Sequence, residues 1–233
     1  MVSDGSDPKT RQAVERFNDP RIKYYEIAHS GKPAVPRNFG IRKAEGEYIA
    51  FCDDDDIWMP EKLKFQIDKI CQDNELGLVY TKCLLEEDDK VVVVPRNGKE
   101  GFIFKELFLS PNFIANSTVL IKKEVINTVG MFDEDIRLKA AEDFDLWLRI
   151  AMRYKIGFID RPLVIHREIS DSLTKGTLVK LKIQPLVHWQ FYRKKYVRFG
   201  LFIKKLLLIF YRSILIIIHY DRILHLSKRG DRK

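Results

Sequence analysis

The stretch YIAFCDDDDIW, residues 48–58, joins a run of apolar side chains to four consecutive aspartates. Its first five residues are typical of a short buried strand, and Pro60 stands where a helix over 61–67 would begin. The carboxylates therefore follow the carboxyl end of a strand, where ligands bind in open α/β sheets. Carboxylates packed this closely stay ionised when a cation lies near them, and a hard divalent cation prefers oxygen ligands. We therefore expect a cation site at this turn.

The same aspartates also fit a solvated acidic turn or the N-cap of the following helix, since Asp is favoured at helix starts. An EF-hand loop is excluded, because the glycine and the distal glutamate of that loop are lacking here. The acidic stretch alone therefore leaves a cation site and a capping role open.

Helical and strand patterns alternate along the first 170 residues or so. The expected helices cover residues 9–19, 37–44, 61–73, 100–109, 124–129 and 142–154. The expected strands cover residues 22–27, 48–52, 76–85, 91–94, 116–121, 156–159 and 163–166. This alternation predicts an α/β domain with a mostly parallel sheet flanked by helices.

Charge divides the chain into two parts. Residues 172–233 hold 15 Lys/Arg and 2 Asp/Glu, a net charge of +13, whereas residues 1–171 hold 26 and 31, a net charge of −5. We therefore expect a mildly acidic domain at 1–171 and a basic tail at 172–233, and such a tail favours an anionic partner. The three cysteines show no metal or disulfide spacing, which favours a reducing, cytoplasmic compartment.

The tail contains a long apolar run, 201–218, that three basic residues interrupt. At about 100° per residue, one arc of a helix collects Lys194, Arg198, Lys204, Lys205, Arg212, His219 and Arg222. Such a helix over 194–222 is typical of one lying on an anionic membrane surface. Packing on its own domain or on a second subunit, and spanning the bilayer, are the alternatives. Nucleic acid is not an expected partner, since the apolar face is continuous rather than interleaved with cations.

Several short motifs follow one another in a recognisable order. They are Asp4-Gly5-Ser6, Gly31-Lys32-Pro33, Arg37-Asn38-Phe39-Gly40-Ile41, the stretch 44–58, Gly130-Met131-Phe132-Asp133-Glu134 and the stretch 141–149. Together they resemble the family 2 glycosyltransferases of the GT-A fold over roughly residues 2–170. The resemblance implies a Rossmann-like α/β domain that binds a nucleotide-diphosphate sugar.

The resemblance also assigns expected roles to individual residues. It implies nucleotide-sugar binding by Asp4, Arg37, Asn38, Asp53, Asp54 and Glu142. The D-X-D motif falls on residues 53–55, so Asp55 is the expected ligand of Mg²⁺ or Mn²⁺, with Asp56 holding the loop. His166 is expected to reach the metal or the diphosphate, with a structural role as the alternative.

Glu142 and Asp143 open the expected helix that carries Trp147. In the enzymes that this sequence resembles, the second carboxylate is the general base. Asp143 is therefore expected to deprotonate the acceptor hydroxyl, with inversion of configuration at the anomeric carbon. Stabilisation of the helix dipole by acids in a first turn is the alternative. The polar residues 116–118 are expected to border the acceptor or to form a hydrogen-bonded edge.

The family pattern normally begins with a further strand and helix, roughly 30 to 40 residues that this sequence lacks. A fragment, a misplaced start, or a partner chain that supplies the strand would each account for it. The expected activity is that of an inverting, metal-dependent hexosyltransferase of polysaccharide or cell-wall biosynthesis. It would act on a saccharide or lipid-linked acceptor, peripherally on the inner face of the cell membrane. A catalytically inactive, membrane-associated binding or scaffold protein, or an inactive fragment, is the alternative; the oligomeric state is not predicted.

Overall fold

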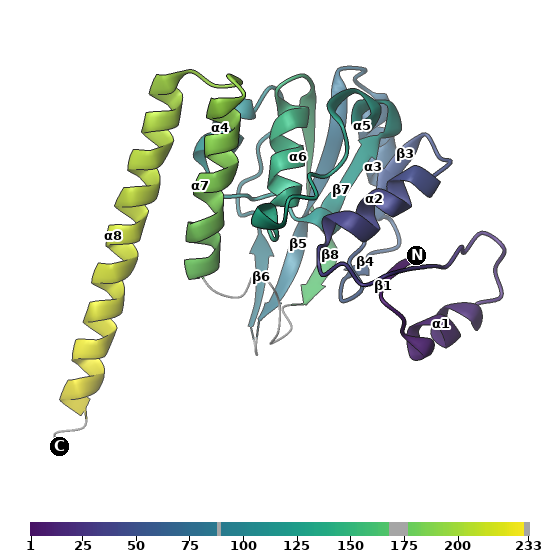
Figure 1. Cartoon of the computed structure of the whole chain (residues 1–233), viewed down its shortest axis with the longest axis horizontal. Helices are drawn as coiled ribbons and strands as arrows, with labels where there is room; N and C mark the ends of the chain where they lie inside the picture. The colour runs from purple at the N-terminus through teal and green to yellow at the C-terminus, as the bar shows by residue number, and fades with distance from the viewer. Residues whose placement is uncertain (88–89, 168–176, 231–233) are drawn as a thin grey trace. The chain divides into compact units, whose positions relative to one another are not determined.

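The computed structural model describes residues 1–87, 90–167 and 177–230, and the side chains of 1–86, 91–167 and 185–214 (Figure 1). The chain forms two compact units, Met1–Lys175 and Gly176–Lys233. The boundary expected from charge, at 171/172, lies outside the described residues.

The first unit alternates short helices and strands. Its helices are α1 (Pro8–Glu15), α2 (Ala34–Lys43), α3 (Lys62–Cys71), α4 (Phe104–Leu109), α5 (Lys123–Val129) and α6 (Glu142–Ala151), with 3₁₀ turns η1 (Asn116–Thr118) and η2 (Ile136–Leu138). Its strands are β1 (Val2–Asp4), β2 (Tyr25–Ile27), β3 (Tyr48–Ala50), β4 (Ile57–Trp58), β5 (Leu76–Glu87), β6 (Lys90–Val94), β7 (Val119–Lys122) and β8 (Lys155–Arg167).

These strands form two sheets. The larger has the order β3-β7-β5-β8-β4, with β6 paired to β5, and the smaller consists of β1 and β2. The prediction of a mostly parallel sheet was wrong. In the larger sheet only β5 and β8 run parallel; the other four pairings are antiparallel. Helix–strand alternation did not fix strand direction, because β5 and β6 form a hairpin and the connection through α4 and η1 returns the chain so that β7 also runs antiparallel to β5.

Two expected elements also changed form. The predicted strand over 116–121 begins as η1, and only β7 is extended. The two predicted strands at 156–159 and 163–166 are one strand, β8, which passes through Pro162. The register between β5 and β8 shifts at this proline. A bulge tolerates a residue without an N–H group, so the strand continues.

The core of the first unit lies between the larger sheet and its helices. Val79 on β5, Leu120 on β7 and Ile70 on α3 pack in one buried cluster. The amphipathic helix α6 adds Leu146, Trp147 and Leu148, none of which is exposed. Burying side chains of this size stabilises the fold by about 2 kcal/mol each. Tyr48 and Ala50 of β3 also pack against this cluster, so β3 and α6 are both held by the core.

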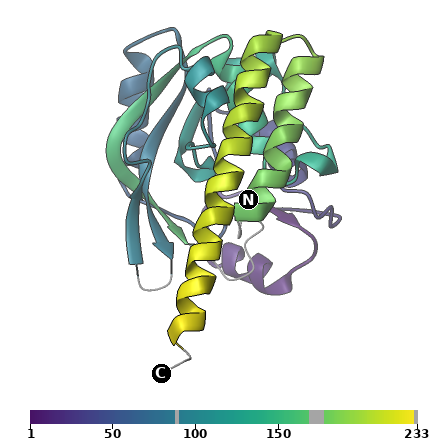
Figure 2. The same ribbon diagram turned by 90° about the vertical axis from the view of Figure 1, so that its left-hand side faces the viewer.

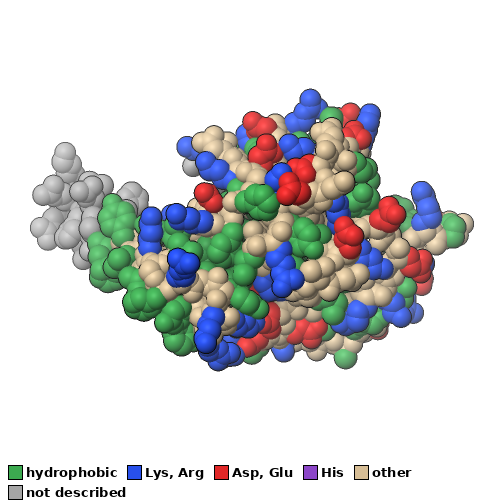
Figure 3. All heavy atoms as spheres, turned by 90° about the horizontal axis from the view of Figure 1, so that it is seen from above, with side chains coloured by type: hydrophobic (Ala, Val, Ile, Leu, Met, Phe, Trp, Pro, Cys, Tyr) green, Lys and Arg blue, Asp and Glu red, His purple; other side chains and the backbone are tan. Residues whose placement is uncertain are grey.

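The second unit consists of helices α7 (Thr177–Arg193) and α8 (Phe199–Gly230), which lie side by side (Figures 1 and 2). Tyr192 of α7 stacks on Phe202 of α8 with ring centroids 4.7 Å apart. Large apolar side chains nonetheless remain exposed, namely Leu186, Trp189, Tyr196, Phe199, Leu207, Phe210, Tyr211 and Ile214. Figure 3 shows hydrophobic and basic side chains mixed over this unit, at the left of the view. Among the described residues, no helix is both long and apolar enough to cross a membrane.

Candidate active site

Arg37 joins three segments that are far apart in the sequence. It lies in the first turns of α2, and its guanidinium donates to Asp53 Oδ1 at 2.8 Å and to Glu142 Oε1 at 2.7 Å. The Arg37 and Glu142 side chains are only 18% and 5% exposed, so this bridge is largely shielded from water. Charge-assisted bonds gain strength in such surroundings. The bridge therefore fixes the aspartate loop against the start of α6.

The first aspartate of the loop is also hydrogen-bonded to η1. The Asp53 N–H donates to Ser117 Oγ at 2.9 Å, and Asn116 Nδ2 donates to Asp53 Oδ1 at 2.9 Å. At the far end of the loop, Trp58 Nε1 donates to the Ser117 carbonyl, also at 2.9 Å. Both ends of the loop are thus bonded to η1, which gives residues 116 and 117 a supporting role.

A buried lysine lies against Trp58, at the end of the loop. Lys62 is 1% exposed, and its Nζ lies 3.9 Å from the centre of the Trp58 ring. Burial lowers the pKa of Lys62 to about 7. The ring offers a cation–π contact that offsets part of the cost of burying the charge.

The remaining aspartates lie in different surroundings. Asp54 is exposed, whereas the Asp56 side chain is only 1% exposed and its Oδ1 lies 2.7 Å from His166 Nδ1. This hydrogen bond raises the pKa of His166, against the effect of burial. Burial, followed by repulsion from the other three aspartates, raises the pKa of Asp55.

These surroundings suit a divalent cation at Asp55. Arg37 bonds to Asp53 and His166 bonds to Asp56, whereas the charged groups that act on Asp55 are the three other aspartates, and only a bond to its own backbone N–H offsets their repulsion. Within the described part of the chain, no three His, Cys, Asp or Glu side chains gather to hold a metal alone. Mg²⁺ commonly uses one or two carboxylates together with substrate phosphates. The residues present therefore fit an ion that a diphosphate helps to hold.

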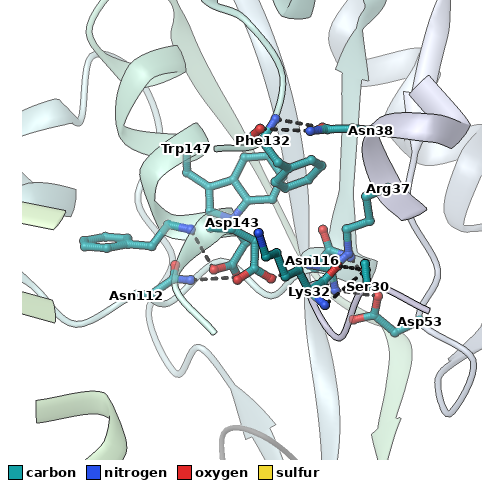
Figure 4. A network of polar contacts seen from close by, with 12 residues as sticks. Ser30, Lys32, Arg37, Asn38, Asp53, Asn112, Asn116, Phe132, Asp143 and Trp147 are labelled. Carbon is teal, nitrogen blue, oxygen red and sulfur yellow. Dashed lines mark hydrogen bonds and ion pairs between the residues drawn. The ribbon is translucent and has the colours of Figure 1, made fainter. Parts of the chain in front are cut away.

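Asp143 lies beside the Arg37 bridge at the start of α6 (Figure 4). One of its oxygens accepts from the Phe144 N–H at 2.6 Å, and the other accepts from Asn112 Nδ2 at 3.1 Å. Burial and the neighbouring Glu142 carboxylate raise the pKa of Asp143 to about 7, although Arg37 opposes the shift. A carboxylate whose pKa lies near neutrality can act as a general base.

Two of the predicted binding residues form hydrogen bonds with backbone groups: Asp4 with the loop before α2, and Asn38 with the segment that leads into α6. Asp4 accepts from the N–H groups of Ser30 and Gly31 at 2.7 and 3.1 Å. Partial burial acts to raise the pKa of Asp4, but the bonds from Ser30 and Gly31 together outweigh it, so the pKa is lowered. The buried amide of Asn38 exchanges two hydrogen bonds with the backbone of Phe132, at 2.9 and 3.0 Å. Asn38 thus fixes α2 to the segment that leads into α6.

The structure brings four of the predicted residues together: Arg37, Asp53, Glu142 and Asp143. Sequence reasoning missed Asn112, which bonds to Asp143. The only signal was a polar residue after Ser110-Pro111, and turns carry such residues for many reasons.

A family model described as glycosyltransferase like family 2 matches residues 1–177. Glycosyltransferase RT0329 of Rickettsia typhi is 28% identical over 84% of the chain, which spans 62% of that protein's length. The Escherichia coli protein UDP-Glc:alpha-D-GlcNAc-diphosphoundecaprenol beta-1,3-glucosyltransferase WfgD is 27% identical over 79% of the chain and 70% of its own length. The crystal structure of Staphylococcus aureus TarS 1-349 with UDP-GlcNAc has the same fold, with a TM-score of 0.64 and 19% identity over 81% of the chain and 56% of that structure.

Proposed function

The chain belongs to glycosyltransferase family 2, and we propose that it transfers a sugar from a nucleotide-diphosphate donor to a saccharide or lipid-linked acceptor. The observation that carries this proposal is the Arg37 bridge between Asp53 and Glu142, with Asp143 beside it. In this proposal the Arg37 guanidinium would bind the departing diphosphate, and the neighbouring Asp143 carboxylate would accept the proton. The name of WfgD, with its UDP-glucose donor and lipid-linked acceptor, supports these substrate classes.

Arg37 would bind the diphosphate, since a guanidinium matches two phosphate oxygens at once. To do so it would exchange part of its contact with Asp53 or Glu142 for phosphate oxygens. The loop carrying Asp53 would stay in place, because its Asp53 N–H bond to Ser117 does not involve Arg37. The nucleotide would thus meet a site that is already rigid.

Asp143 would act as the general base. Its oxygen would take the proton from an acceptor hydroxyl while the hydroxyl oxygen attacks the anomeric carbon. The bond from that carbon to the diphosphate would break on the opposite face, so the configuration would invert. A pKa of about 7 leaves roughly half of the Asp143 carboxyls ionised at neutral pH.

Asp55 would hold Mg²⁺ or Mn²⁺ in this proposal. His166 would contribute through Nε2, because its Nδ1 is engaged by Asp56. Such an outer partner orients a ligating imidazole. The ion would supply positive charge to the leaving diphosphate.

We further propose that the second unit lies on the inner face of the cell membrane. Exposed Phe199, Leu207 and Phe210 would enter the interface, and exposed basic residues such as Arg198 and Lys204 would meet anionic headgroups. One expected member of the basic face was placed wrongly: Lys205 is fully buried, and burial lowers its pKa to about 8. The side chains of His219 and Arg222 lie outside the described residues.

The test of the activity is release of nucleoside diphosphate from UDP-glucose, UDP-GlcNAc and GDP-mannose, with GlcNAc-diphosphoundecaprenol as the acceptor. We expect acceptor-dependent release from one donor with Mn²⁺. Asp143→Asn should lower it by at least a hundredfold. Asp68→Asn, an exposed carboxylate of α3, is the matched control and should leave the rate unchanged. Nucleotide binding without turnover for every donor would instead favour a binding protein.

A further inference from the structure

Asn112 lies on the connection between α4 and η1. It belongs to a ring of three hydrogen bonds that links Asp143 to Trp147 and is closed by helix α6. Asn112 Nδ2 donates to Asp143 Oδ2 at 3.1 Å, and Asn112 Oδ1 accepts from the Ile114 N–H at 3.1 Å. The Ile114 carbonyl in turn accepts from Trp147 Nε1 at 3.2 Å. Asp143 and Trp147 are four residues apart on α6, so the ring begins and ends on the same helix.

The ring fixes which way the Asn112 amide faces. Its oxygen is committed to a backbone N–H, which can only donate, so the NH₂ group must be the side that faces Asp143. The Ile114 and Trp147 side chains are almost fully buried, which holds the connection in place. Figure 4 shows the Asn112 amide pointing at the Asp143 carboxylate.

We propose that Asn112 is a positioning residue for Asp143: it holds the carboxylate in the orientation that accepts the acceptor's proton and favours its ionised form. The inference rests on the proposed role of Asp143 as the base. A donor on one oxygen and the Phe144 N–H on the other fix the plane of the carboxylate, and each oxygen keeps a lone pair for a substrate hydroxyl.

The charged groups around Asp143 explain why a neutral donor is used. Glu142 on α6 and Asp53 after β3 both disfavour the ionised carboxylate, whereas Arg37 on α2 favours it. The guanidinium is already bonded to the two other carboxylates. Asn112 is the described side chain that donates a hydrogen bond to Asp143 itself. Hydrogen bonding to the ionised form lowers a pKa, so Asn112 keeps the base from becoming fully protonated at neutral pH.

Two variants separate the donated bond from support of the connection. Asn112→Ala removes both hydrogen bonds of the amide. Asn112→Asp is isosteric and keeps an oxygen for the Ile114 N–H, but it replaces the donor by a second carboxylate. Asn97→Ala removes an exposed amide elsewhere and is the matched control.

Carbon-13 NMR of aspartate-labelled full chain would follow the Asp143 titration, identified by the signal that Asp143→Asn removes. We expect the midpoint to rise by about one pH unit in Asn112→Ala and further in Asn112→Asp. In the transfer assay, kcat should fall roughly tenfold or more with an unchanged donor KM, and the acid limb of kcat/KM should move up with the NMR midpoint.

The NMR readout needs no substrate, so the two hypotheses fail separately. A shifted midpoint in a protein that transfers no sugar would retain the positioning of Asp143 and reject the proposed function. Unchanged midpoints in both variants, or an unchanged kcat in an active enzyme, would overturn the inference. If Asn112→Ala does not fold, Asn112→Asp gives the same decision because it retains the bond to Ile114.

Discussion

Replacing Asp143 by Asn should stabilise the protein, and by more at higher pH. The folded pKa of about 7 lies above the ordinary value of 3.8. Below about pH 4 the carboxyl is protonated in both the folded and the unfolded protein, so it does not change the free energy of unfolding. As the pH rises towards 7, the unfolded protein ionises first, and the free energy of unfolding falls relative to that of a variant with an uncharged residue. Linkage puts this cost at about 2 kcal/mol at pH 5 and about 4 kcal/mol at pH 8.

The asparagine gives back part of this gain. It has a single acceptor oxygen, so either the Phe144 N–H or Asn112 Nδ2 must face an NH₂ group. Such a mismatch costs about 1 kcal/mol at any pH. We therefore expect a net gain of about 1 kcal/mol at pH 5 and about 3 kcal/mol at pH 8.

Urea unfolding of both proteins at the two pH values, followed by far-ultraviolet circular dichroism, measures the difference. Asp68→Asn, at an exposed site, should show no such pH dependence. A stability difference for Asp143→Asn that is the same at pH 5 and pH 8 would refute the reasoning, because it would mean that Asp143 is not held against ionisation.

Three further changes test other parts of the site. Arg37→Met leaves the Asp53 and Glu142 carboxylates without the guanidinium that bonds to both, so the free energy of unfolding at pH 8 should fall by about 3 kcal/mol. The control Arg16→Met, at an exposed position, should have little effect. Lys62→Met should stabilise the protein by about 4 kcal/mol at pH 7 and by about 1 kcal/mol at pH 10, because burying the charged lysine costs the protein stability as the pH falls from 10.5 towards the folded pKa of about 7; a gain of the same size at both pH values would contradict this cause. Asp55→Asn should weaken Mn²⁺ binding in the presence of UDP by at least tenfold in calorimetry, and equal affinity in the variant and the parent would remove Asp55 from the proposed metal site.

The sequence was sufficient where side-chain chemistry and local periodicity agree. The apolar run ending at Cys52, the helix after Pro60 and the amphipathic helix around Trp147 all came from patterns within about ten residues. The family resemblance then brought Arg37, Asp53 and Asp143 to one site. Their proximity in the structure agrees with that expectation, while their individual roles stay predictions.

The sequence was insufficient where a contact depends on long-range geometry. Strand direction depends on which end of the sheet a connection enters, and nothing within residues 95–118 encodes it locally. The partner of Asp143 lies 31 residues away in a turn, where an asparagine has many local uses. The burial of Lys205 likewise follows from tertiary packing, which helical periodicity alone does not include.

Trp58 is in a position to report changes in the aspartate loop through its intrinsic fluorescence. Its indole is bonded to Ser117, lies against Lys62, and is three residues from Asp55. Of the two other tryptophans, Trp147 is fully buried and Trp189 lies in the second unit. In a Trp189→Phe variant, a change in emission that Trp58→Phe abolishes would come from the loop rather than from Trp147. Ion or nucleotide titrations could then be followed by fluorescence, without a label and before any acceptor is known.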